Sequence, residues 1–103
     1  MTSDIIRLNT NNIITNNNKI IYIGGKNNDN QKHGLGTIFI NNKPIIVGEF
    51  YNNMKHGHCV KYNLEGTKIF SGLYKNDMKN GIGFHYYDNK IVRNYYYKDE
   101  LIF

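Results

Sequence analysis

Glycine recurs at a nearly fixed interval along this chain of 103 residues. Two sets keep the period of 23 or 24 residues: Gly24, Gly48 and Gly72, and Gly34, Gly57 and Gly81. The text around them recurs as well, because Asn-Asn-Met-Lys-His-Gly at 52–57 returns at 76–81 as Asn-Asp-Met-Lys-Asn-Gly. A period of this length indicates one supersecondary unit stacked on copies of itself. Such arrays offer long regular surfaces, which favours binding over catalysis in an enclosed pocket.

Size and charge narrow the possible partners. A chain of this length forms one domain with a thin core. The net charge of +5 and the pI near 9.3 are mildly basic, and two arginines are present. This balance is compatible with an acidic protein partner or an anionic membrane surface. It is too weak and too poor in arginine to favour nucleic acid.

Cysteine usage and targeting signals point to the cytoplasm. Cys59 is the only cysteine, so an intrachain disulfide is impossible and a reducing compartment is expected. No apolar run approaches the roughly 20 residues of a membrane helix. The first residues lack the basic-then-apolar pattern of a secretory signal. We therefore expect a cytoplasmic protein, either free or associated with the cytoskeleton or a membrane.

The local pattern is that of short strands. Apolar residues at helical spacing are nearly missing, whereas β-branched and aromatic runs alternate with clusters of Asn, Gly, Asp and Lys. Tight turns are expected at 41–44, where Pro44 cannot sit inside a central ladder, and at 63–66 and 88–90. The predicted strands of this antiparallel meander lie near 19–25, 36–40, 45–51, 58–62, 67–75, 82–87 and 91–97.

Glycine inside a strand suggests close packing. In Phe70-x-Gly72-x-Tyr74 the three side-chain positions share one face of the sheet. The missing Cβ leaves a gap between two bulky residues, so an aromatic ring from the next strand or the next repeat is expected to lie in it. The glycines to which we assign a structural role are Gly24, Gly34, Gly36, Gly48, Gly57, Gly72, Gly81 and Gly83.

These residues resemble the MORN repeat. Phe70-Ser71-Gly72-Leu73-Tyr74 continuing to Lys79-Asn80-Gly81-Ile82-Gly83 is similar to the family pattern, and the copy from Ile46 differs in having Cys59 in place of the last glycine. The resemblance implies an all-β fold, a single elongated and twisted antiparallel sheet in which each repeat is one hairpin. It gives about three and a half repeats in a domain over 19–103, near 22–44, 46–67, 70–90 and, partially, 92–103. Residues 1–18 are left as either an N-terminal cap or a flexible segment.

The residues do not assemble a recognisable catalytic or metal site. His33 and His56 occupy equivalent places in successive repeats, about 10 Å apart at two strand spacings, which is too far for one shared metal. His58 and Cys59 have no second cluster at zinc-binding spacing, and His85 is expected on a sheet face. Acidic residues fall mainly in turns and termini. We therefore predict no enzyme activity, no metal and no cofactor.

Two ladders remain as candidates for binding. The aromatic ladder is expected along one face, either as core alone or as both core and a groove that holds a partner. Its members are Tyr22, Phe39, Phe50, Tyr62, Phe70, Tyr74, Tyr86 and Tyr96. The basic ladder is expected either as solvated turn residues or as a row that meets anionic lipid headgroups. Its members are Lys32, Lys55, Lys79 and Arg93.

The sequence therefore predicts a non-enzymatic scaffold that binds an extended or helical segment of another protein along the aromatic groove. The resemblance implies service in cytoskeletal, ciliary or membrane-linked assemblies. Two alternatives remain open. One is a peripheral module for anionic phospholipid, and the other is a self-association module that forms a homodimer through the open edge near Val92–Phe103.

Overall fold

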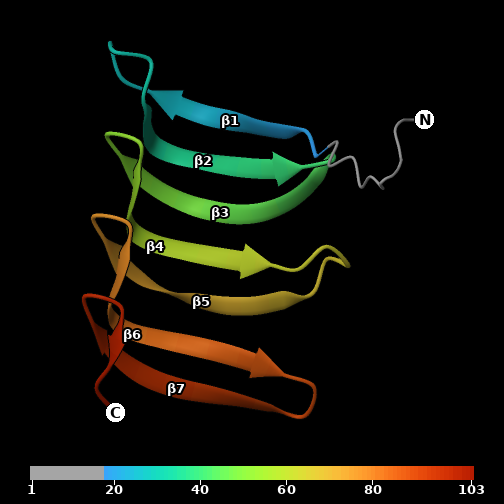
Figure 1. Cartoon of the computed structure of the whole chain (residues 1–103), viewed down its shortest axis with the longest axis vertical. Helices are drawn as coiled ribbons and strands as arrows, with labels where there is room; N and C mark the ends of the chain where they lie inside the picture. The colour runs from blue at the N-terminus through green and yellow to red at the C-terminus, as the bar shows by residue number, and fades with distance from the viewer. Residues whose placement is uncertain (1–17) are drawn as a thin grey trace, which may run out of the picture.

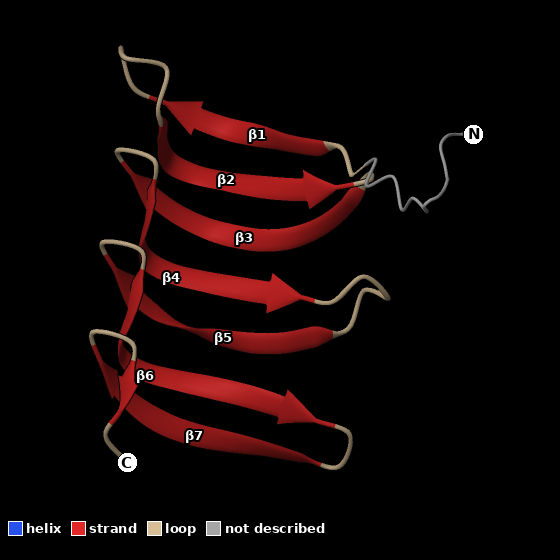
Figure 2. Cartoon of the chain, viewed as in Figure 1, coloured by secondary structure: helices blue, strands red, loops and turns tan. Residues whose placement is uncertain are grey.

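A computed structural model describes residues 18–103, and within them the chain forms one open sheet of eight antiparallel strands in chain order (Figure 1). Figure 2 shows no helix in this part of the chain. The cap or flexible segment predicted for residues 1–18 lies, apart from Asn18, outside the described residues. The strands are β1 Ile20–Lys26, β2 Lys32–Ile40, β3 Lys43–Tyr51, β4 Met54–Tyr62, β5 Lys68–Lys75, β6 Met78–Tyr87, β7 Lys90–Tyr97 and β8 Glu100–Leu101.

Asn and Asp make the tight turns. In four two-residue turns both residues have positive φ, which gives the turn the twist that neighbouring strands need. Asn and Asp accept this left-handed backbone at lower cost than other side chains. These turns are Asn41-Asn42, Asn52-Asn53, Asn76-Asp77 and Lys98-Asp99.

Three predicted strands begin later than the real ones. Strands expected from 36, 58 and 82 begin at Lys32, Met54 and Met78, because the Lys-x-Gly segments belong to the strands and not to the turns. Gly57 has φ of 116° and lies where the pairing of β3 with β4 shifts register, and Gly34 and Gly81 repeat this. Glycine serves a bulge here as readily as a turn. Pro44, expected in a turn, is the second residue of β3 and also lies beside a register shift.

A row of small residues crosses the sheet. Strand pairing places one member on each of β1 to β7, directly opposite one another. The row, called the glycine row below, is Gly24, Gly36, Gly48, Cys59, Gly72, Gly83 and Asn94. This arrangement lets aromatic rings lie against the backbone.

Rings fill the gaps that the sequence predicts. A Cβ at Gly83 would lie 2.6 Å from the Phe70 ring, and one at Gly36 would lie 2.2 Å from the Tyr22 hydroxyl. One detail differs from the expectation. Phe70 comes from the same strand as Gly72, two residues earlier, and its ring leans over both that glycine and its partner on β6.

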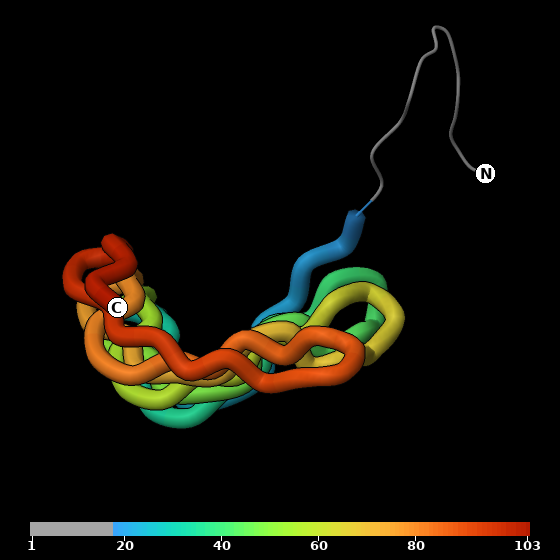
Figure 3. The backbone as a smooth tube through the Cα atoms, turned by 90° about the horizontal axis from the view of Figure 1, so that it is seen from below, coloured from blue at the N-terminus to red at the C-terminus, as the bar shows by residue number. Residues whose placement is uncertain are grey.

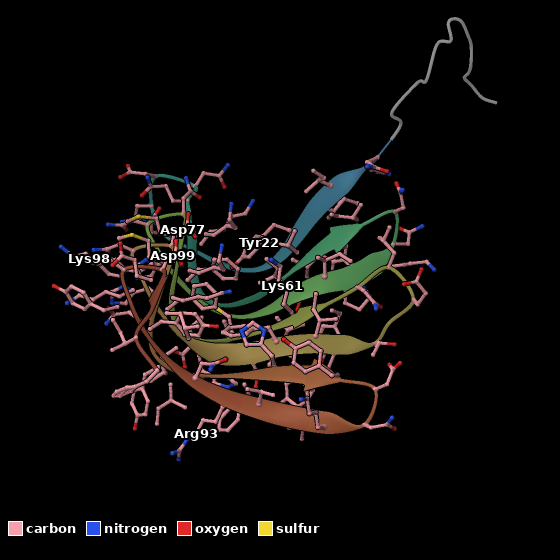
Figure 4. All side chains as sticks on the ribbon, turned by 60° about the horizontal axis from the view of Figure 1, so that its bottom comes forward. Tyr22, Lys61, Asp77, Arg93, Lys98 and Asp99 are labelled. Carbon is pink, nitrogen blue, oxygen red and sulfur yellow. The ribbon has the colours of Figure 1, made fainter. Side chains whose placement is uncertain are left out.

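The sheet is curved into a trough. Seen end-on in Figure 3, the stacked strands descend from one end, run along a floor and rise again. Figure 4 shows Tyr22 and Lys61 on the inside of the curve and Arg93 on the outside. The buried apolar residues of this single layer lie on the concave side: Phe50, Cys59, Phe70 and Tyr74.

Three reciprocal clasps join the turns β3–β4, β5–β6 and β7–β8 to the starts of β2, β4 and β6. The Lys55 N–H donates to Asp77 Oδ1 at 3.0 Å, and the Asp77 N–H donates to the Lys55 carbonyl at 2.9 Å. This reciprocal clasp closes turn β5–β6 onto the start of β4. The same two bonds join Lys32 with Asn53 and Lys79 with Asp99.

The side chain that follows each clasp lysine accepts a hydrogen bond from the backbone N–H of the first residue of the same turn. The Asn76 N–H donates to His56 Nδ1 at 3.3 Å, and the Asn52 N–H donates to His33 Nδ1 at 3.4 Å. In the third copy Asn80 Oδ1 takes this place and accepts the N–H of Lys98 at 3.4 Å. The two histidines are further separated by the Tyr51 ring, whose centroid lies 4.8 and 5.7 Å from theirs. Their role in this geometry is structural.

The glycine row can be tested by adding one methyl group. Gly83→Ala is expected to lower the free energy of unfolding by about 1–3 kcal/mol, because the new Cβ overlaps the Phe70 ring. In the Phe70→Leu background the same change is expected to cost less, since the flat ring is gone. Denaturant unfolding of the four proteins in this double-mutant cycle measures the coupling. Equal costs in both backgrounds would contradict the packing.

The clasp at Asp77 has a pH signature. Burial acts to raise the pKa of this carboxyl, but the hydrogen bond from the Lys55 N–H and the ion pair with its ammonium bring the pKa below 3.8. The carboxylate therefore adds stability above that value and loses it as the pH falls through the lower folded pKa. Asp77→Asn is expected to keep the backbone clasp, as Asn53 does, and to be less stable than wild type only above this window. Asp77→Ala is expected to be the less stable variant at every pH in urea unfolding.

Candidate binding surface

The trough is lined by two lines of side chains on either side of the glycine row. Both follow from strand pairing and the alternation of side chains along each strand. One line is Tyr22, Ile38, Ile46, Lys61, Phe70, His85 and Val92. The other is Lys32, Phe50, Lys55, Tyr74, Lys79 and Tyr96.

The eight predicted aromatic residues do not share one face, so that expectation is wrong in part. Five lie in the trough: Tyr22, Phe50, Phe70, Tyr74 and Tyr96. Phe39, Tyr62 and Tyr86 each follow a trough residue by one position, so their side chains leave on the outer face. The Tyr86 hydroxyl accordingly bonds the hydroxyl of Ser71, an outer-face residue, at 2.8 Å.

Most of the trough rings form its floor. Phe50, Phe70 and Tyr74 are 4%, 3% and 8% exposed, so they contribute shape and little accessible surface. Phe70 and Tyr74 meet edge to face with centroids 5.9 Å apart, and Tyr22 meets Phe50 in the same way at 5.5 Å. Tyr22 and Tyr96 are only partly buried. They are the two predicted trough rings that a partner can reach.

The lysines of the basic ladder lie over these rings. Lys55 Nζ is 5.3 Å from the centroid of Tyr74, and Lys79 Nζ is 4.6 Å from that of Phe70. Lys32 Nζ stands 5.8 Å from the centroid of Tyr22. Cation–π contact holds each ammonium against the apolar floor. The expectation of solvated turn lysines is therefore wrong, because the Lys-x-Gly segments are strands.

Arg93 does not belong with the three lysines. It pairs with Phe84 on the outer face, and its guanidinium lies 5.9 Å from the Tyr95 ring (Figure 4). The four basic residues therefore do not form one surface. The trough is also lined by residues that belong to neither predicted ladder, among them the exposed Lys61 and the partly buried Ile46. Counting alternate positions from Gly48 and Cys59 would have found both.

Charge in the trough is partly compensated. Lys55 Nζ and Asp77 Oδ1 are 2.9 Å apart, the one ion pair within residues 18–103. Burial lowers the pKa of His85, and the nearby Lys79 ammonium lowers it further. His85 Nε2 and the Tyr96 hydroxyl are hydrogen-bonded. These contacts place polar groups beside the apolar floor of the trough.

The described residues hold no cluster of metal-binding side chains, and their one thiol is buried. They contain no group of three or more histidine, cysteine or acidic side chains placed to hold a metal. Burial raises the pKa of the Cys59 thiol, which is 1% exposed and donates to the Glu49 carbonyl at 3.5 Å. A buried neutral thiol is a packing residue. Among these residues no helix is long and apolar enough to cross a membrane.

Tyr74 gives the trough floor an alkaline signature. Burial raises the pKa of its phenol from 10.0 to about 12, and the negative charges of nearby groups add to this. The stabilising effect of the neutral phenol is complete below pH 10.0 and is lost as the pH rises towards 12. Wild type is expected to lose on the order of 2 kcal/mol more unfolding free energy than Tyr74→Phe across this window. Tyr51→Phe, which removes a half-exposed hydroxyl, is the control and should follow wild type.

Comparison with known proteins agrees with this architecture. The MORN repeat family model matches residues 28–43, 47–63 and 70–91. The "Inactive protein tyrosine kinase pTKL" of Plasmodium berghei (strain Anka) is 34% identical over 84 residues, covering 82% of this chain and 6% of that protein. The protein of the same name in Plasmodium falciparum (isolate 3D7) is 30% identical over 81 residues, covering 79% of this chain and 5% of that protein. The chain thus spans about a twentieth of the length of these relatives. With three matched repeats on a single sheet of stacked hairpins, it belongs to the MORN-repeat family.

Proposed function

We propose that this chain is a non-enzymatic scaffold whose trough holds an extended or helical segment of another protein. The observation that carries the proposal is the combination of a curved sheet with three lysines fixed over its aromatic floor. A concave surface gives a segment more contact area than a flat one. Cations held in place lose less side-chain entropy on binding than free ones.

The contact residues proposed from the sequence need one revision. Phe50, Phe70 and Tyr74 shape the floor, whereas contact with a partner falls to exposed or half-buried groups. Those groups are Tyr22, Lys32, Ile46, Lys61, His85 and Tyr96. Apolar contact at Tyr22 and Ile46 would provide affinity, and the lysines would set orientation.

A membrane surface fits the geometry less well. The lysines lie inside a curve and Arg93 lies on the other face, so a flat bilayer cannot meet all four at once. Each lysine near an anionic surface contributes only about 1 kcal/mol. Flotation with and without anionic vesicles tests this alternative.

Self-association through the β7 edge also has less support than the sequence suggested. The chain turns back after Asp99 and covers part of that edge, since β8 pairs with Tyr96 and Tyr97 and the Ile102 N–H donates to the Tyr95 carbonyl at 2.8 Å. The covered stretch includes three of the eight residues of β7. Light scattering at two protein concentrations tests the homodimer.

Photo-crosslinking from the two faces tests the proposal directly. A benzophenone amino acid is placed in the native cell at Lys61 or Val92 in the trough, and at Leu35 or Leu73 on the outer face. The same protein is expected to crosslink from both trough positions and from neither outer position, as read by mass spectrometry. Crosslinks to it from Leu35 and Leu73 alone would place the binding surface on the outer face and overturn the proposal.

A further inference from the structure

The three lysines of the clasps, Lys32, Lys55 and Lys79, occupy equivalent positions in successive repeats. They differ in whether an acidic group of the chain pairs with the ammonium. The charge of Lys55 is compensated within the chain, because its clasp residue is Asp77 and Lys55 Nζ lies 2.9 Å from Asp77 Oδ1. Lys32 makes the same clasp with Asn53, an uncharged residue. Its ammonium lies over the Tyr22 ring and makes no ion pair within the described residues, although it is near enough to Asp77 to help lower the pKa of that carboxyl.

Lys79, the third clasp lysine, is intermediate between the paired Lys55 and the unpaired Lys32. Its clasp residue is Asp99, whose Oδ1 accepts the Lys79 N–H at 2.7 Å. The Lys79 ammonium lies instead between two rings, 4.6 Å from the centroid of Phe70 and 5.1 Å from that of Tyr96. A carboxylate is therefore close to this lysine, although the two do not form an ion pair. Figure 4 shows Asp77 and Asp99 together at the turn edge of the trough.

The trough is consequently asymmetric along its length. Towards β1 the turns at 41–42 and 52–53 are asparagine pairs and the β1–β2 turn carries the exposed Asp29, whereas the turns towards β8 carry Asp77 and Asp99. Lys61 on β4 adds a further exposed cation on the concave face. In the described part of the trough, Lys55 is thus paired with a carboxylate, whereas Lys32 and Lys61 make no ion pair.

We propose that the segment held by the trough is acidic and places a carboxylate at Lys32, against the edge of the Tyr22 ring, so that the partner binds in one direction only. This inference rests on the proposed function, since it names the chemistry of the same surface. The Lys32 ammonium is half-buried and already held over a ring, so a carboxylate gains a charge-assisted hydrogen bond without first ordering a mobile side chain. At Lys55 the intrachain aspartate already occupies the corresponding place.

The chain itself supplies the test variant. Asn53→Asp copies the next repeat, where an aspartate in the same turn position makes the same clasp, so the fold is expected to tolerate it. The new carboxylate should neutralise Lys32 from within. The probe is a fluorescein-labelled peptide of glutamate residues, with the all-glutamine peptide of equal length as its uncharged counterpart. Binding is followed by fluorescence anisotropy at low salt.

Wild type is expected to bind the glutamate peptide and not the glutamine peptide. Asn53→Asp and Lys32→Gln should each weaken binding about threefold to tenfold, as expected for loss of a charged contact between partly ordered groups. The double variant Lys55→Gln/Asp77→Asn removes a charge pair without changing net charge and should weaken binding less than Lys32→Gln does, because Lys55 is already paired within the chain. Lys75→Gln removes one positive charge from an exposed residue of the outer face and controls for net charge.

Three results would overturn the inference. They are failure of the glutamate peptide to bind wild type at low salt, equal weakening by Asn53→Asp and Lys75→Gln, and a response to Asn53→Asp in anionic vesicles but not in the peptide. Each leaves the proposed function open to its own measurement, because trough crosslinks to a protein would persist whatever the charge of its segment. Unfolding midpoints of all variants confirm that a loss of binding is not a loss of fold.

Discussion

Close approach between aromatic rings and bare backbone is the constraint on which this structure depends. Seven strands each place one small residue in the glycine row, and the Phe70 and Tyr22 rings rest where Cβ atoms would otherwise stand. A single-layer sheet has no second layer to bury its apolar face against. Rings that lean over the glycines of their own and neighbouring strands solve this problem, because they bury themselves on the sheet that carries them. The rings of the trough floor are therefore the core of this sheet.

The clasps supply a second constraint, which acts between repeats. Each joins a turn to the start of the preceding hairpin's second strand, so within residues 18–103 these clasps bond one repeat to the next. Stability in such an array is close to a sum over neighbouring units. The same device also sets the charge pattern. At Asp77 the clasp residue also pairs with the lysine above the rings, whereas at Asn53 it does not.

Much of the fold follows from sequence, and the faces of individual residues follow less well. The glycine period and the Phe70-x-Gly72-x-Tyr74 pattern predict an all-β repeat sheet with rings over glycines, and the structure confirms this. The Lys-x-Gly segments are ambiguous in the sequence, because a glycine suits either a turn or a bulge. The positive φ of Gly57 belongs to a bulge. Side chains alternate between the two faces, so an error of one residue in the alternation assigns a side chain to the wrong face. Tyr86 accordingly lies on the outer face, and the Lys55 ammonium lies over a ring of the trough.

Ring-current shifts provide the most direct measurement of the central claim. In a proton NMR spectrum the Hα signals of Gly72 and Gly83 should be displaced by the ring current of Phe70, unlike the Gly66 signal, because that ring lies against the first two glycines and no atom lies within 4 Å of a Cβ built at the third. Phe70→Leu should return both signals towards ordinary glycine positions. Unshifted Gly72 and Gly83 signals in the wild-type protein would contradict the account.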